Sequence, residues 1–204
     1  MEPQEKILKV ALGMFFRFGI KHVTMDDIAR ELGMSKKTIY QFYKEKDDLV
    51  NQLCEHALVS QEQLFDAINR DAKDPIHEIM TISQKMREMM QKINPLFFLD
   101  MQKFYPVAYD RFQKFMDSCA YKNVRDNIKK GMETGIYRPD LDIDFVSRYR
   151  MIQIEMVMFG NYFNFEKIPF TRASELLLEM FVYGICTVKG HKLINNYKKI
   201  KEEE

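Results

Sequence analysis

The segment TMDDIARELGMSKKTIYQFYKEK, residues 24–46, constrains the fold of this chain more than any other stretch. Thr24 can cap the N-terminus of a short helix, and Asp27, three residues later, can accept a hydrogen bond from the Thr24 backbone. Gly33 suits the left-handed conformation that ends a helix. Ser35 can then cap a second helix. The pattern therefore predicts two short helices joined by a tight turn.

The apolar residues of this segment indicate how the two helices pack. Ile28, Ala29 and Leu32 mark one face of the first helix. Ile39 and Phe42 can pack back on that face from the second helix, and the small Ala29 lets the helices cross closely. The segment thus predicts a helix-turn-helix. The residues left for the outer faces of the second helix are Lys36, Lys37, Thr38, Tyr40, Gln41 and Tyr43.

The charges of this segment favour contact with a polyanion. Residues 33–46 hold four lysines against one glutamate, a net charge of +3, whereas the whole chain has 31 basic and 30 acidic residues. Lys36 and Lys37 stand at a helix N-terminus, where the helix dipole disfavours cations. Phosphate groups would make these positions favourable. The pattern therefore favours a helix that enters DNA over two ordinary core helices.

Individual roles on DNA follow from residue type. Gln41 is the candidate for base recognition, because a side-chain amide can pair bidentately with adenine in the major groove. Lys36, Lys37, Thr38 and Tyr40 are expected to face the groove with it, and Thr24, Tyr43 and Lys46 to contact phosphates. The predicted DNA-binding residues are Thr24, Ser35, Lys36, Lys37, Thr38, Tyr40, Gln41, Tyr43 and Lys46.

A wider pattern covers residues 1–50: an apolar helix ending at Gly19, the capped second helix, the run SKKTIY and Lys46 at the start of a fourth helix. This pattern resembles the TetR family of bacterial transcriptional regulators. The family often carries His just after the tyrosine, where this chain has Gln41 and Phe42. The resemblance implies a helix-turn-helix DNA-binding domain over residues 1–50 and an effector-binding and dimerisation domain over residues 51–204.

Helical signals continue along the remaining chain, with no convincing strand. Asp74-Pro75 and Asn94-Pro95 each look like a cap followed by proline in the first turn of a helix. About eight or nine helices are expected, so the fold class is all-α, with a three-helix DNA-binding domain and a C-terminal helical bundle. Other expected boundaries are a long helix from Lys46 to near Arg70, one from Pro106 closed by Gly135, and caps at Asp142 and Thr171.

The last two predicted helices are apolar on more than one face. Apolar residues at spacings of 4, 3, 4, 3 and 4 form a continuous seam, but Met151 and Ile154 lie on other faces of the same helix. A helix that is apolar nearly all round is buried on more than one side. We therefore expect helices near 143–164 and 172–190 to form a homodimer interface, and a near-palindromic operator on double-stranded DNA. The seam is Phe145, Tyr149, Ile152, Met156, Phe159 and Phe163.

The resemblance places an effector inside the C-terminal domain, and the chain is rich in side chains suited to one, with 15 methionines and 16 phenylalanines. Methionine and aromatic groups can line an adaptable apolar cavity. For any single residue, an ordinary core position is the better interpretation. The predicted ligand-binding residues are Met86, Met90, Phe104, Tyr109, Phe112, Met116, Tyr149 and Met156.

Other classes of function have little support. Cys54, Cys119 and Cys186 are far apart and form no CxxC motif, which suits small buried groups in a reducing cytosol. We expect no metal site and no cofactor, because no usual ligand spacing occurs. Neither a signal peptide nor a membrane-spanning run is apparent, so a cytoplasmic protein with no membrane partner is expected.

The sequence therefore predicts a homodimeric transcriptional regulator, most consistent with a repressor that a small apolar molecule releases from DNA. Two alternatives stay open. The protein could bind DNA without any small-molecule effector, or it could be an enzyme on a helical bundle. The second alternative lacks support, because no nucleophile–base or paired-carboxylate arrangement is present. We predict that the protein is not an enzyme.

Overall fold

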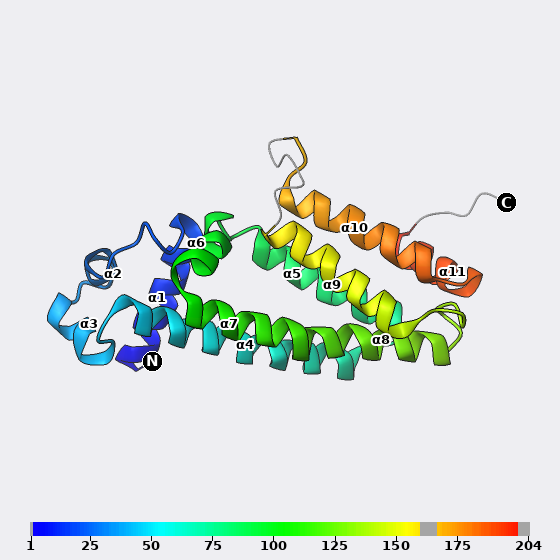
Figure 1. Cartoon of the computed structure of the whole chain (residues 1–204), viewed down its shortest axis with the longest axis horizontal. Helices are drawn as coiled ribbons and strands as arrows, with labels where there is room; N and C mark the ends of the chain where they lie inside the picture. Colours follow the sequence, from blue (N-terminus) through cyan, green and yellow to red (C-terminus); the bar gives the residue numbers. More distant parts are fainter. Residues whose placement is uncertain (1, 160–166, 200–204) are drawn as a thin grey trace. The chain divides into compact units, whose positions relative to one another are not determined.

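The computed structural model describes residues 2–159 and 167–199, and over these residues it is helical, with one isolated β-bridge between Tyr137 and Cys186 (Figure 1). The predicted all-α class is confirmed. The predicted number of helices was too low, since eleven α-helices and one π-helical segment occur in these ranges. They are α1 Pro3–Phe18, α2 Met25–Leu32, α3 Lys36–Phe42, α4 Lys46–Asp71, α5 Pro75–Met90, α6 Leu96–Phe104, α7 Pro106–Phe115, η1 Met116–Ala120, α8 Tyr121–Glu133, α9 Ile143–Phe159, α10 Phe170–Ile185 and α11 Val188–Lys198.

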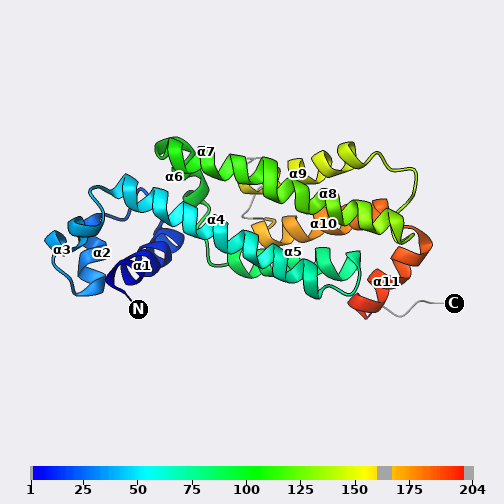
Figure 2. The same ribbon diagram turned by 90° about the horizontal axis from the view of Figure 1, so that it is seen from below.

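The helices form two compact units, each made of two stretches of chain. The first unit contains residues 1–61 and 92–115, and the second contains residues 62–91 and 116–204. Helix α4 begins in the first unit and ends in the second. Within the first unit, α2 lies beside both α1 and α3 (Figure 2). A functional boundary after residue 50 stays a prediction, because the compact units follow a different division.

The core of the first unit joins the first four helices. Ile7 and Phe15 from α1, Ile28 from α2, Ile39 from α3 and Leu49 from α4 are all essentially buried. Buried residues recur at four-residue steps along these helices, as at Ile7, Ala11 and Phe15 on α1 and at Leu49 and Leu53 on α4, which places them on one face of each. Burial of this shared apolar surface holds the three N-terminal helices against the start of α4.

The core of the second unit is built around Tyr137, in the loop after α8. Its ring lies directly over Gly131, and its hydroxyl donates a 3.0 Å hydrogen bond to Asn127 Oδ1. Ile128 and Phe181 belong to the same buried cluster. The bundle can close at this point because α8 presents a glycine to the ring, and Gly135 then turns the chain with a φ of 67°.

Two predicted boundaries near the C-terminus were wrong. Thr171 is not a cap, because α10 already begins at Phe170, after Pro169. The expected helix over residues 172–190 is interrupted at Cys186, which is extended, and Thr187 caps α11 by accepting a hydrogen bond from the Gly190 backbone. A threonine hydroxyl can satisfy the free N–H groups of a new helix, and this local bond competes with continuation of the old one. The caps expected at Asp74 and Asp142 are confirmed.

The described part of the chain shows neither a membrane span nor a metal-ligand cluster. None of its helices is both long and apolar enough to cross a membrane. Among the same residues, no group of three or more His, Cys, Asp or Glu side chains is placed to hold a metal ion.

Candidate DNA-binding interface and effector site

Helix α2 begins with the predicted capping box. The Asp27 backbone N–H donates to Thr24 Oγ1 at 3.2 Å, and the Thr24 backbone N–H donates to Asp27 Oδ2 at 3.0 Å. The bonds from Thr24 lower the pKa of the Asp27 carboxyl. Helix α2 ends at Gly33, whose φ of 62° and ψ of 28° are the left-handed values expected for a C-terminal glycine. The predicted turn is thereby confirmed.

Helix α3 starts with a second cap and exposes a polar face. Ser35 Oγ accepts a 3.1 Å hydrogen bond from the Thr38 backbone N–H. Ile39 is fully buried and fixes the rotation of the helix. As a result, four of the predicted groove-facing residues are exposed, while Thr38 is half-buried. The exposed four are Lys36, Lys37, Tyr40 and Gln41.

The two lysines of α3 differ in their surroundings. Lys36 Nζ lies 2.7 Å from Asp26 Oδ1 on α2, and this hydrogen-bonded contact raises the pKa of Lys36. Lys37 makes no side-chain hydrogen bond or ion pair with any residue the structure describes. Lys37 is thus the better-placed cation for a phosphate, because Lys36 is already ion-paired with Asp26.

The expected positions of Phe42 and Tyr43 were interchanged. Tyr43 is 1% exposed, so it is not on the outer face, and its hydroxyl donates to the Gln4 carbonyl oxygen at 3.5 Å. Phe42, expected to pack inward, is 37% exposed. Both lie within 60° of Ile39 on a helical wheel, because one turn takes 3.6 residues. Helix α3 ends at Phe42, and the extended backbone of Tyr43 directs its ring into the core.

Lys46 begins α4 as predicted, but its ammonium group already has partners. Nζ donates to the carbonyl oxygen of Ile20 at 2.6 Å and lies 3.5 Å from that of Lys21. Partial burial lowers the pKa of Lys46. This lysine therefore joins α4 to the turn between α1 and α2, and any contact with phosphate would be an additional role.

The predicted dimer seam lies on an exposed face of α9. Phe145 is 70% exposed, Tyr149 48% and Ile152 56%, while residues on the opposite face, such as Val146, are buried. Met180 on α10 is 72% exposed. Phe163 lies outside the described residues, as does the expected continuation of α9 to residue 164. An exposed apolar surface of this kind normally marks an interaction site.

The predicted ligand-binding residues divide between the two units. Phe104, Tyr109 and Phe112 belong to the first unit; Met86, Met90, Met116, Tyr149 and Met156 belong to the second. The expectation of interior positions fails for two of them, because Tyr149 lies on the exposed seam and Phe104 is 38% exposed. The Phe104 ring instead lies 4.6 Å from Lys21 Nζ. Contact of a ligand with any of these residues stays a prediction.

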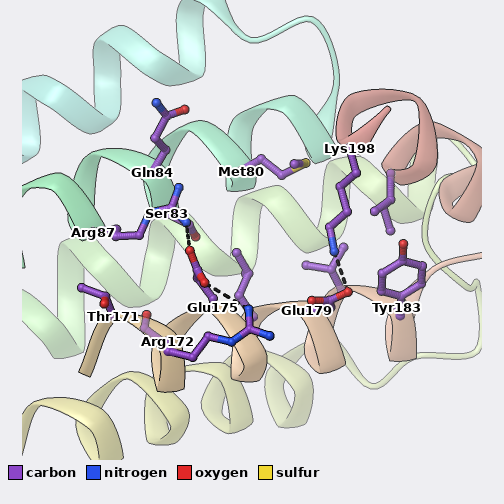
Figure 3. A pocket seen from close by; sticks show the side chains of 14 residues that line it. Met80, Ser83, Gln84, Arg87, Thr171, Arg172, Glu175, Glu179, Tyr183 and Lys198 are labelled. Carbon is purple, nitrogen blue, oxygen red and sulfur yellow. Dashed lines mark hydrogen bonds and ion pairs between the residues drawn. The ribbon is translucent and has the colours of Figure 1, made fainter. Parts of the chain in front are cut away.

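The second unit contains a pocket of about 280 Å³ between α5, α10 and α11, lined by none of the predicted residues (Figure 3). Its charged side chains are already paired. Arg87 and Arg172 both contact Glu175, and Lys198 Nζ lies 2.6 Å from Glu179 Oε1. Met80, Leu178 and Val182 add apolar surface. The three cations of this pocket therefore face two carboxylates, and the two arginines share one of them.

Two side chains that matter in this structure were not singled out from the sequence. Asp100 on α6 accepts a hydrogen bond from the backbone of Lys21. Arg150 on α9 is buried within the second unit, at 7% exposed. The sequence could have indicated Arg150, because it is a charged residue between Val146 and Val157 on the inner face of an apolar helix. No local sequence feature distinguishes Asp100.

The capped α2, the left-handed turn and the exposed basic face of α3 together define a helix-turn-helix DNA-binding protein. Residues 7–53 match the sequence pattern of the bacterial regulatory proteins of the tetR family. The chain is also 26% identical over 151 residues to the transcriptional repressor KstR2 of Mycobacterium tuberculosis, covering 71% of this chain and 74% of that protein. The N-terminal part of the chain therefore matches the tetR-family regulatory domain, and the chain as a whole is similar to a TetR-type repressor.

Solved structures agree with this fold. A TetR-family regulator from Marinobacter aquaeolei superimposes with a TM-score of 0.74 and 16% identity, over 99% of this chain and 100% of that one. A transcriptional regulator from Saccharomonospora viridis in complex with choline gives a TM-score of 0.72 and 18% identity, over 90% of this chain and 97% of that one. At these identities the likeness establishes the architecture alone.

Proposed function

We propose that this protein is a sequence-specific transcriptional repressor whose α3 enters the major groove of its operator. The observation that carries the proposal is the rotation of α3: Ile39 is fully buried, which leaves Lys37 and Gln41 exposed and without side-chain partners among the described residues. An unpaired ammonium can neutralise a phosphate, and an exposed amide can pair with a base edge. Relatives such as KstR2 are named as repressors, which favours repression over activation.

We further propose that the protein acts as a homodimer through α9 and α10. The exposed side chains of Phe145, Ile152 and Met180 support this, since a second copy would remove them from water. A two-fold dimer would present two α3 helices about 34–36 Å apart, which matches successive major grooves on one face of DNA. The operator should therefore be a near-palindrome.

Selection of binding sites from random duplex DNA tests both proposals. The full chain should enrich a near-palindromic sequence, and sedimentation of the complex should give two chains per duplex. Enrichment of no sequence at all, with binding that depends only on salt, would contradict sequence-specific recognition. Enrichment of a single half-site by a monomer would contradict the dimer alone.

The regulator is proposed to respond to a small, mainly apolar molecule bound in the second unit. The structure of the choline-bound relative supports ligand binding within this architecture, and the methionines of α5 and α9 supply adaptable surface. To release DNA, the ligand must bind the form that cannot bind DNA more tightly than the other form. The alternative, a regulator without an effector, predicts that no compound changes operator affinity.

A further inference from the structure

Arg150 is a buried cation in the middle of the inner face of α9. It is 7% exposed, and the side chains four residues before and seven residues after it, Val146 and Val157, are buried as well. Gln153, one turn further along, is 4% exposed. Two strongly polar side chains therefore lie next to each other on a helix face that otherwise packs into the core of the second unit.

The positive charge of Arg150 is not matched by a carboxylate among the described residues. NH1 donates to Gln153 Oε1 at 3.2 Å, and the guanidinium carbon lies 5.6 Å from the centre of the Phe181 ring. Burial lowers the pKa of Arg150 to about 10. The side chain is therefore still charged at neutral pH, and its partners in the described part of the chain are one neutral hydrogen-bond acceptor and one aromatic ring.

This environment differs from that of other arginines in the second unit. Arg87 and Arg172 contact Glu175, Arg125 contacts Asp144, and Arg148 lies 3.0 Å from Asp117. Those pairs are partly or largely exposed, where ion pairing contributes little to stability. The most buried of these arginines is the one without a carboxylate partner. A buried charge is strongly unfavourable unless an opposite charge compensates it.

We propose that Arg150 and Gln153 bind the carboxylate of an amphipathic organic acid, whose apolar body packs in the core of the second unit. This inference rests on the proposed effector response and identifies the chemical class of the effector. A planar guanidinium matches a carboxylate by two parallel hydrogen bonds, and the Gln153 amide can donate a third. The single positive charge and the neighbouring Phe181 and Val157 favour a monoanion with apolar surface over a dianion such as inorganic phosphate.

The test compares Arg150→Met with Arg148→Met, a matched change two residues away on the exposed face of the same helix. Methionine keeps much of the length of the arginine side chain but removes its charge. Without ligand, Arg150→Met should raise Tm by about 2–4 °C or more, because it removes an uncompensated buried charge. Arg148→Met should leave Tm nearly unchanged.

Ligand binding is measured by Tm and by calorimetry with decanoate, dodecanoate and 4-phenylbutyrate. The matched alcohols and inorganic phosphate serve as chemical controls. At least one acid should stabilise the wild type, its alcohol should not, and Arg150→Met should weaken acid binding at least tenfold. Arg150→Lys should bind with intermediate affinity, because it keeps the charge but loses the bidentate geometry. Arg148→Met should bind like the wild type.

Three results would overturn the proposal: no acid in the panel stabilises the wild type, the acid binds Arg150→Met as tightly as the wild type, or Arg150→Met is less stable than the wild type without ligand. Operator binding is measured on the same proteins without ligand, so that failure of the anion site can be distinguished from failure of the proposed regulator function. If operator binding is retained while no acid binds, the regulator assignment stands and the anion site is wrong. If an acid binds but no operator is selected, the anion site stands and the regulator assignment is wrong.

Discussion

The carboxylate of Asp100 in α6 accepts a 2.8 Å hydrogen bond from the backbone N–H of Lys21, in the turn that follows α1. Nearby, the Asn94 backbone N–H, just before α6, donates to the carbonyl oxygen of Phe16 at 2.6 Å. The turn between α1 and α2 is thus held by a helix far away in the sequence. Any movement of α6 would act directly on the helix-turn-helix, because these bonds join the two elements.

Replacing Asp100 should weaken this connection. Asp100→Ala leaves the Lys21 N–H without its acceptor and should lower the free energy of unfolding by about 1–3 kcal/mol. Asp100→Asn keeps an oxygen acceptor and should lose less. Urea unfolding of the full chain measures both. Asp110→Ala, an exposed change on α7, is the control and should stay within about 0.5 kcal/mol of wild type. Equal losses for Asp100→Ala and Asp100→Asn would show that the hydrogen bond is not the cause.

Two substitutions on α3 should have different effects on operator binding. Gln41→Ala should relax specificity at one base pair, with a loss of about 1–3 kcal/mol on the preferred operator. Lys37→Ala should weaken binding to all sequences alike and reduce the dependence of log K on log salt by about 1. Titrations at several salt concentrations, on selected and scrambled duplexes, distinguish the two effects. An unchanged salt dependence for Lys37→Ala would exclude a phosphate contact.

Tyr43→Phe provides a further test on the same DNA. The Tyr43 ring is buried and its hydroxyl faces the Gln4 carbonyl, so removal of the hydroxyl should leave operator affinity within experimental error. Lys46→Ala should instead lower stability as well as affinity, since its ammonium group bonds the Ile20 carbonyl. A selective loss of operator affinity in Tyr43→Phe would restore the phosphate contact expected from the sequence.

The dimer proposal predicts that one charge on the seam is enough to separate the chains. Met180→Glu places a carboxylate on an apolar surface that dimerisation would bury, and burial of an unpaired charge is strongly unfavourable. Sedimentation velocity at micromolar concentration should therefore show a monomer with much weaker operator binding. Val107→Glu, at a 52% exposed position of α7, is the control and should remain dimeric. A dimeric Met180→Glu would place the interface elsewhere.

Two helical glycines should respond to alanine in opposite directions. A Cβ atom at Gly131 would lie 2.0 Å from Tyr137 Cδ2, and that ring is fully buried, so Gly131→Ala should lower the free energy of unfolding by about 1–3 kcal/mol or more. A Cβ atom at Gly13 would meet nothing within 4 Å, and Gly13→Ala should stabilise by about 0.5–1 kcal/mol. Thermal unfolding of both variants is the measurement, and the same sign for both would contradict the packing argument.

Glu78 should make stability depend on pH. This α5 residue is 4% exposed, and burial raises the pKa of its carboxyl despite Lys130 Nζ at 3.6 Å. The folded state therefore binds the proton more tightly than the unfolded state, and the Glu78 contribution to stability increases as pH falls through the raised pKa. Relative to Glu78→Gln, the wild type should gain stability between about pH 7 and about pH 4. A stability difference that is constant over this range would contradict the assignment.

Short-range features of this protein could be predicted because their partners are neighbours in the sequence. The Thr24–Asp27 capping box, the Ser35 cap and the left-handed Gly33 need only a few consecutive residues, and all three are present as expected. The α9 seam also followed from spacing alone, since helical periodicity places Phe145 and Ile152 on one face. These features are sufficient to indicate the resemblance to tetR-family regulators and to predict which helix would face DNA.

Packing decided what spacing left open. Helical spacing places both Phe42 and Tyr43 close to the inward face of α3. Because the helix ends at Phe42 and the Tyr43 backbone is extended, the Tyr43 ring is the one that enters the core. Lys46 and Asp100 obtained backbone partners from residues 26 and 79 positions away in the chain. The energetic cost of the Arg150 charge depends on how deeply the side chain is buried, and the side chains of other helices determine that burial. Local sequence determined where helices begin and which faces are apolar, whereas contacts between helices determined which polar groups are paired and which are left without a partner.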